Sequence, residues 1–301
     1  MWLPETNTSS RCGTAQCCGV RAGRLTNLDA SFSVEKIVRK RRNEGVAETI
    51  SAISAPGQQR ESWWERPQSF EPAYCPAGYV PVANIDLVIF DLDGTLVDTA
   101  PDIAAALAAT LAEVGVGAPP LEVVKQLVGD GARELIRRAL ALAGADGELD
   151  HLQARFLAHY GAHVSDRSRA YPGVDAALAA LAAAGVTMAV VTNKPGAIAR
   201  RLLADLALAQ RFRDVIGDGD GFPRKPDPTA ARGLIAVAGT RPDRTAVIGD
   251  GLPDVRTARA VGAKAIAAAW GYVPPERLAA ESPDRLARTP EEAAQFVLGA
   301  T

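Results

Sequence analysis

The sequence has few aromatic residues, almost no net charge and no long apolar run. Aromatic residues make up 5% of the 301 residues, too few for the base-stacking surfaces of proteins that bind single-stranded nucleic acid. The formal net charge of −2 gives no electrostatic reason to expect nucleic acid or an anionic membrane as a partner. No strongly apolar run of about 18 residues exists, and no apolar stretch typical of a secretory signal opens the chain. These absences predict a soluble, cytoplasmic protein that binds neither nucleic acid nor a membrane.

Cysteine is confined to the first quarter of the chain, at Cys12, Cys17, Cys18 and Cys75. Their spacing lacks the pair of cysteines separated by two other residues that is typical of a zinc knuckle. Residues 1–82, which contain all four, show neither helical nor strand periodicity. We therefore predict that this segment is a disordered extension or an artefact of gene-start assignment. The second interpretation rests on Val80 and Val82, because an alternative start codon is translated as valine in a conceptual sequence.

From residue 85 onward, short apolar runs alternate with helical patterns. The apolar runs lie at 85–90, 188–191, 215–216, 246–248 and 263–268, and the helical patterns at 103–114, 174–184, 198–206, 229–237 and 255–261. This alternation indicates a parallel sheet with helices on both faces. A long, mostly helical stretch interrupts it after the first run. The sequence therefore predicts an α/β fold in which residues 83–99 and 171–301 form a doubly wound parallel sheet, and residues 100–170 form an inserted α-helical subdomain.

Polar side chains follow the predicted strands where each strand ends. In chain order they are Asp91 and Asp93, then Thr192 and Asn193, then Lys225, and last Asp250 and Asp254. Ligands of such sheets bind beyond the carboxyl ends of the strands, so these side chains are expected to converge. Asp91 and Asp93 are two residues apart and are expected to project to the same side of an extended chain. Two negative charges at such a short distance need a cation or a shared proton to stabilise them.

The residue types in this set fit metal-assisted phosphate chemistry. Several carboxylates suit Mg²⁺ better than zinc. The Thr192 hydroxyl and the Lys225 ammonium suit phosphate oxygens, and Gly94 permits a close approach of the backbone to a ligand. A calcium loop that begins D-x-D is a competing interpretation, but it requires glycine at the sixth position, where Leu96 stands.

The stretches that carry these residues resemble the motifs of the haloacid dehalogenase superfamily of phosphohydrolases, over nearly all of residues 85–298. Residues 91–98 read DLDGTLVD, residues 190–193 match the second motif, Lys225 with the following Pro-Asp-Pro matches the third, and residues 249–254 match the fourth. The resemblance implies a Rossmann-like core with a mobile helical cap at residues 100–170. It also implies a phosphoric monoester hydrolase whose partner is a small phosphorylated metabolite.

The resemblance further implies a role for each residue of the motifs. Asp91 would be the nucleophile that forms an aspartyl-phosphate, and Asp93 the general acid and base. Mg²⁺ would be held by the Asp91 carboxylate, the Asp93 carbonyl oxygen and Asp250, with Asp254 a ligand directly or through water. The phosphoryl group would be held by Thr192, the backbone of Asn193 and Lys225.

A cap segment at residues 128–135 bears on the substrate. Gly129 and Gly131 would expose backbone N–H groups, and Arg133 carries a charge suited to a carboxylate. The segment is similar to the cap loop of phosphoglycolate phosphatases, which implies 2-phosphoglycolate as substrate. The competing interpretation is that the glycines merely separate two helices and Arg133 is exposed.

Other outcomes stay open at this point. Relatives with the same motifs act on sugar phosphates, N-acetylmuramate 6-phosphate or pyrophosphate, or are phosphomutases, and a catalytically silent protein that binds phosphorylated metabolites is a further alternative. The protein is expected to be a monomer or a homodimer. Lys194 is interpreted as a charge at the rim of the site that can touch the substrate without being required for catalysis. The remaining polar residues receive structural interpretations: Asp98 and Asp102 as helix caps, Asp218 and Asp220 as turn residues, and His151, His159 and His163 as exposed side chains.

Overall fold

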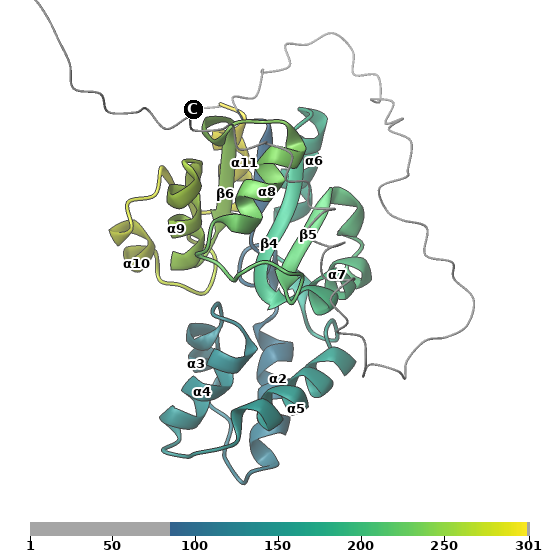
Figure 1. Cartoon of the computed structure of the whole chain (residues 1–301), viewed down its shortest axis with the longest axis vertical. Coiled ribbons are helices and arrows are strands. Elements are labelled where there is room, and N and C mark those ends of the chain that lie inside the picture. Colours follow the sequence, from purple (N-terminus) through teal and green to yellow (C-terminus); the bar gives the residue numbers. More distant parts are fainter. Residues whose placement is uncertain (1–84, 300–301) are drawn as a thin grey trace, which may run out of the picture.

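The computed structural model describes residues 85–299, so the predictions made for residues 1–82 lie outside the described residues. A six-stranded sheet with the order β5-β4-β1-β6-β7-β8 forms the centre (Figure 1). Every neighbouring pair of its strands is parallel. The strands are β1 (Leu87–Phe90), β4 (Thr187–Pro195), β5 (Asp214–Asp218), β6 (Thr245–Gly249), β7 (Lys264–Ala268) and β8 (Arg285–Ala287). The predicted parallel α/β fold is confirmed.

Both faces of the sheet are covered by helices. Successive residues of β1 alternate between two apolar clusters, with Leu87 and Ile89 in one and Val88 and Phe90 in the other, as side chains on a strand must. The first cluster is shared with α8 (Thr229–Ala238), α9 (Leu252–Val261) and α10 (Pro275–Ala280). The second is shared with α6 (Val174–Ala183), α7 (Gly196–Asp205) and α11 (Pro290–Val297). Single 3₁₀ turns, η2 (Ala209–Arg211) and η3 (Pro242–Arg244), precede β5 and β6.

The sequence patterns missed the elements of the last part of the chain. β8 has three residues and lies at the edge of the sheet, where burial is incomplete and the apolar run is too short to recognise. α10 and α11 are helices of six and eight residues that each begin with a proline, which is well tolerated in the first helical turn. Their brevity leaves too little periodicity for a helical prediction.

The inserted segment leaves and rejoins the sheet domain through two short antiparallel strands, β2 (Val97–Asp98) and β3 (Arg169–Ala170). Between them lie α2 (Ala100–Ala112), α3 (Leu121–Leu127), α4 (Ala132–Leu142) and α5 (Leu149–Ala162). Figure 1 shows these helices gathered beyond one end of the sheet. They are called the cap below, and the boundaries of the domains stay a prediction.

Asp102 links the segment that enters the cap to the segment that leaves it. Its buried carboxylate accepts hydrogen bonds from the backbone N–H of Arg167 at 3.0 Å and of Ser168 at 2.7 Å, and from the Ser168 hydroxyl at 2.7 Å. The helix-capping role predicted for Asp102 is therefore wrong, because this side chain bonds to the residues just before β3 rather than to the start of its own helix. Asp98 does accept a hydrogen bond from the Ala100 N–H at the start of α2, at 3.3 Å.

Candidate active site

The carboxyl ends of the central strands place the predicted site residues at one edge of the sheet. Asp91 directly follows β1, and its backbone N–H donates to the carbonyl of Ile248 in β6 at 2.8 Å. Thr192 and Asn193 lie near the end of β4, and Asp250 directly follows β6. The close hydrogen bonding between β1 and its two neighbours thus brings residues together that are far apart in sequence.

Asp91, Asp250 and Asp254 form a buried acidic cluster in which one carboxylate oxygen of each lies within 4.8 Å of the others. Burial raises the pKa of Asp91 to about 6, with the Lys225 ammonium opposing the rise and the Asp254 carboxylate adding to it. Burial and the Asp91 carboxylate raise the pKa of Asp250 well above its ordinary value. Carboxylates this close favour a bound cation. Because all donors are oxygens, the set fits the Mg²⁺ that the sequence predicts.

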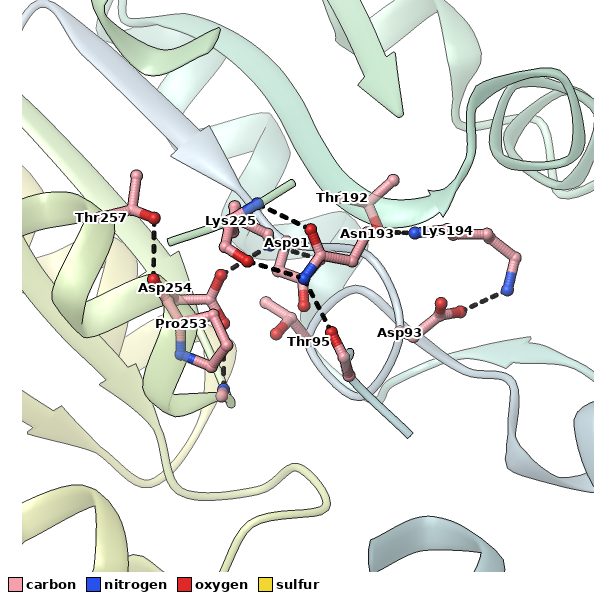
Figure 2. Close-up of polar contacts among 12 residues, drawn as sticks. Asp91, Asp93, Thr95, Thr192, Asn193, Lys194, Lys225, Pro253, Asp254 and Thr257 are labelled. Carbon is pink, nitrogen blue, oxygen red and sulfur yellow. Dashed lines mark hydrogen bonds and ion pairs between the residues drawn. The ribbon is translucent and has the colours of Figure 1, made fainter. Parts of the chain in front are cut away.

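Lys225 supplies a positive charge within the acidic cluster. Its ammonium lies 2.8 Å from an Asp91 oxygen and 2.6 Å from an Asp254 oxygen, and the side chain is buried (Figure 2). Burial alone would lower the pKa of Lys225, but the two carboxylates outweigh it and raise that pKa above its ordinary value. The ammonium is therefore protonated at neutral pH and fixes the direction of the Asp91 carboxylate.

The Asp93 side chain points away from the acidic cluster. One of its oxygens accepts a hydrogen bond from the Thr99 hydroxyl at 2.6 Å. The same oxygen accepts a hydrogen bond from the Lys194 ammonium at 2.7 Å (Figure 2). The expectation that Asp91 and Asp93 project to one side is met only in that both line the same pockets. The chain is not extended here, because it turns at Gly94, which has a φ of +82°.

Lys194 is buried, and the prediction of a rim charge is wrong. Its side chain is 3% exposed, and the ammonium lies 4.5 Å from the ring centre of Tyr160 in the cap. Burial lowers the pKa of Lys194, but the Asp93 carboxylate and the Tyr160 side chain raise it by more, so the net change is upward. The cap covers this lysine, which a pattern read along one strand cannot show.

The Asn193 side chain links the core to the cap. Its carboxamide nitrogen donates to the carbonyl of Gly129 at 2.9 Å and to that of Lys225 at 3.2 Å, and its oxygen accepts from the Lys225 N–H at 2.8 Å. Figure 2 shows this side chain between Lys225 and Thr192. Since these contacts occupy the Asn193 side chain, only its backbone remains for a ligand, which agrees with the role implied by the resemblance.

Two adjoining pockets share Asp91, Asp93, Val128 and Gly129. The core-side pocket also contains the rest of the acidic cluster, with Lys225 and Tyr272. The cap-side pocket contains Thr192, Asn193 and Lys194 together with Gly131 and apolar cap residues, among them Ile103, Leu135 and Phe156. The site therefore has one charged side and one side that the cap closes.

Arg133 lines neither pocket. Its side chain is 44% exposed and pairs with Asp150 on the surface of the cap. Of the cap residues that the sequence singled out, the structure brings Gly129 and Gly131 to the site and leaves Arg133 outside it, as the competing interpretation expects.

Three further residues contact the site, and the sequence interpretation did not use them. The Thr95 hydroxyl lies 3.1 Å from an Asp250 oxygen and accepts the Asp250 N–H at 3.0 Å. The Tyr272 N–H donates to the other Asp250 oxygen at 2.7 Å. Thr95 belongs to the DLDGT stretch and could have been found there, whereas Tyr272 and the cap residue Tyr160 lie in no recognisable pattern.

Several of the other acidic and histidine residues that the sequence singled out have structural partners. Among residues 85–299, the acidic cluster is the one group of at least three potential ligands close enough to hold a metal ion. Asp218 pairs with Arg224 and Asp220 with Arg200. His159 contacts Glu113, and His163 contacts Asp166. No helix in this part of the chain has the length and apolar character needed to cross a membrane.

Comparisons with known proteins agree with this site. The model of the family described as haloacid dehalogenase-like hydrolase matches residues 88–268. The phosphoglycolate phosphatase of Rhodospirillum rubrum is 42% identical over 192 residues, which cover 62% of this chain and 80% of that protein. The phosphoglycolate phosphatase of Agrobacterium fabrum is 42% identical over 190 residues, covering 62% and 81%. The crystal structure of a predicted phosphoglycolate phosphatase from Haemophilus somnus superposes with a TM-score of 0.66 at 26% identity, covering 71% of this chain and 98% of that one. The chain belongs to the haloacid dehalogenase-like hydrolase family.

Proposed function

We propose that the protein is a Mg²⁺-dependent phosphatase that hydrolyses 2-phosphoglycolate to glycolate and phosphate through an aspartyl-phosphate on Asp91. The observation that carries the proposal is the buried Asp91 carboxylate, held by Lys225 where the core-side and cap-side pockets meet. A nucleophile in that position has a charged pocket for the phosphoryl group on one side and, on the other, a pocket for the leaving group that the cap partly covers. The names of the relatives that are 42% identical support the choice of substrate.

In the first half-reaction an Asp91 oxygen attacks phosphorus, and the bond from phosphorus to the ester oxygen breaks. Asp93 gives its proton to the departing oxygen. In the second half-reaction Asp93 takes a proton from water, whose oxygen attacks phosphorus and releases Asp91. The position of Asp93 supports this role, because it lines both pockets and Thr99 and Lys194 fix its carboxylate.

The transferred phosphoryl group carries its charge on three oxygens, so positioned donors supply most of the stabilisation. Lys225, the Thr192 hydroxyl and the Asn193 N–H are the donors proposed for this purpose. The residues proposed to hold Mg²⁺ are Asp91, Asp250 and Asp254 with the Asp93 carbonyl oxygen. Bound Mg²⁺ supplies positive charge that offsets the repulsion between the Asp91 carboxylate and the phosphoryl oxygens.

The size of the cap-side pocket supports a small leaving group. The space in which the centre of a water molecule fits is about 40 Å³, whereas a single water needs roughly 10–15 Å³ by the same measure. Room for a few heavy atoms suits glycolate better than a sugar. The cytoplasmic location, the monomeric or homodimeric state and the domain boundaries stay predictions from the sequence.

The test is phosphate release from a panel of small phosphate esters, with and without Mg²⁺, by the protein and its Asp91→Asn variant. We expect 2-phosphoglycolate to have the highest kcat/KM, and the substitution to lower kcat on the order of a thousandfold or more, since it removes the nucleophile. Preference for a sugar phosphate would reject the proposed substrate and keep the chemistry. Turnover by Asp91→Asn at the rate of the unchanged protein would reject the chemistry.

A further inference from the structure

The cap-side pocket needs a group that recognises a carboxylate if its ligand is glycolate-like. Its cap wall is mostly apolar, with Ile103, Leu135 and Phe156, and an ionised carboxylate is costly to bury against such a wall without a partner. Arg133, which the sequence predicts for this purpose, is on the outer surface of the cap. The carboxylate partner must therefore be another residue of the pocket.

Lys194 is the cationic side chain among the residues that line this pocket. An ammonium has three N–H donors. Lys194 Nζ donates a hydrogen bond to Asp93 and also contacts the Tyr160 side chain, whose ring centre lies 4.5 Å away. These leave an N–H available to a ligand in the pocket.

Tyr160 offers a second donor at the same place. Among residues 85–299, its hydroxyl is the buried side-chain polar atom that has no hydrogen-bond partner, although buried polar groups in native proteins are nearly always paired. The residue is 2% exposed and lines the cap-side pocket. An unpaired phenol beside a lysine, in a pocket closed by apolar side chains, is the donor set that a small anion would complete.

Because the leaving group is short, its ester oxygen and its carboxylate must bind close to each other. In 2-phosphoglycolate one methylene carbon separates the ester oxygen from the carboxylate. The ester oxygen must lie beside Asp93 to receive its proton, and Asp93 lies 2.7 Å from the Lys194 ammonium. A carboxylate one carbon away from that oxygen therefore falls next to Lys194 and the Tyr160 ring above it.

We propose that the Lys194 ammonium and the Tyr160 hydroxyl together bind the carboxylate of the leaving group and set the preference for an acidic substrate. The inference rests on the proposed function. Lys194 comes from β4 of the core and Tyr160 from α5 of the cap, so the binding pair is complete only when the cap lies over the core. A substrate carboxylate between them adds a bond between the two parts.

The test compares kcat/KM for 2-phosphoglycolate with kcat/KM for ethyl phosphate, which has the same ester but no carboxylate. Tyr160→Phe removes one oxygen and keeps the ring over Lys194. We expect it to lower the ratio of the two kcat/KM values about tenfold, because a hydrogen bond to a charged group is lost. Lys194→Met removes the charge and is expected to lower the ratio tenfold or more. Lys125→Met replaces a half-buried lysine of α3 that pairs with Glu122 outside both pockets; it is the matched control and is expected to leave the ratio unchanged.

The ratio of the two kcat/KM values separates a loss of carboxylate binding from a general loss of catalytic activity. Lys194→Met also removes a partner of Asp93, so its kcat is expected to fall for both esters, and only the ratio reports on the carboxylate. A high ratio in the unchanged protein that stays high in both variants would overturn this inference and leave the proposed function intact. A ratio near one in the unchanged protein would overturn both. If Lys194→Met fails to fold, Tyr160→Phe alone decides the matter.

Discussion

Replacing Lys225 by methionine tests the electrostatic balance of the acidic cluster. Lys225 lies within 2.8 Å of oxygens of Asp91 and Asp254, and Asp250 adds a third carboxylate to the cluster. In the absence of metal, the substitution leaves three buried carboxylates without the ammonium. Removing one partner of a buried ion pair costs about 3–5 kcal/mol. For a folded part of this size, each kcal/mol corresponds to roughly 2–4 °C in Tm, so we expect Tm to fall by about 6–20 °C.

The assay is thermal unfolding of Lys225→Met and the unchanged protein in EDTA and in millimolar Mg²⁺, at several pH values. We expect Mg²⁺ to raise the Tm of the variant, because a cation returns to the cluster. The control is Lys264→Met, whose side chain is 49% exposed and pairs with Asp284. An exposed pair contributes no more than about 1 kcal/mol, so the Tm of this control is expected to change little.

The raised pKa of Asp91 fixes the direction in which stability changes with pH. The pKa of Asp91 is raised from 3.8 to about 6 in the folded protein, so the folded state binds that proton more tightly than the unfolded state. Its contribution to stability is therefore greatest below the unfolded pKa and is lost as pH rises through the folded pKa. In Lys225→Met the opposing ammonium is gone and this pKa rises further. We therefore expect the Tm of the variant in EDTA to move closer to that of the unchanged protein as the pH is lowered from about 8 to about 5.5. A variant that melts within a degree or two of the unchanged protein at every pH would refute this reasoning.

Three further substitutions test separate parts of the structure. Asp102→Asn should lower the free energy of unfolding by about 2–3 kcal/mol in urea titration, because an amide N–H would face the N–H and O–H donors of Ser168; an unchanged midpoint would contradict its role in fastening the cap. Gly94→Ala should lower kcat strongly in steady-state assays, because its φ is +82° and a Cβ there meets the Asp250 carboxylate; normal turnover would show that Asp250 can move without loss. Arg133→Met should change KM for 2-phosphoglycolate by less than a factor of about two, since an exposed side chain makes no contact with the pockets; a large rise in KM would reinstate the role that the sequence predicts.

The residues at the carboxyl ends of the strands could be predicted from the sequence, because all parallel strands of a sheet end at the same edge. Asp91 and Asp250 directly follow two buried apolar runs, and the two strands are neighbours in the sheet. Any residue just beyond such strands must lie at the same edge. The direction of the Asp93 side chain could not be read in this way. It depends on the turn in which the N–H groups of Thr95, Leu96 and Val97 bond to the carbonyl of Leu92.

The exposed position of Arg133 follows from the helical periodicity of residues 132–142, whereas the glycines at 129 and 131 indicate only a loop before that helix. In α4 the buried residues are Ala132, Leu135, Ile136, Ala139 and Leu140, which is the spacing of one helix face. Arg133 lies off that face. The same pattern gives no sign of which buried cap residues meet the core, because that depends on how the cap is placed on the sheet.

The two ends of the substrate therefore depend on different kinds of information in the chain. The residues proposed to bind the phosphoryl end follow strands of one sheet, and local sequence fixes their position. The residues proposed for the leaving-group end are Lys194 of the core and Tyr160 of the cap, which contact each other. That contact exists only through tertiary packing between elements that carry no shared pattern. Relatives that keep the first set while changing the residue at position 160 would keep the reaction and change the substrate, since the Asp91, Lys225 and Asp254 contacts do not involve the cap helix. On this argument substrate preference in such a fold is decided by residues of the cap that the motifs do not contain.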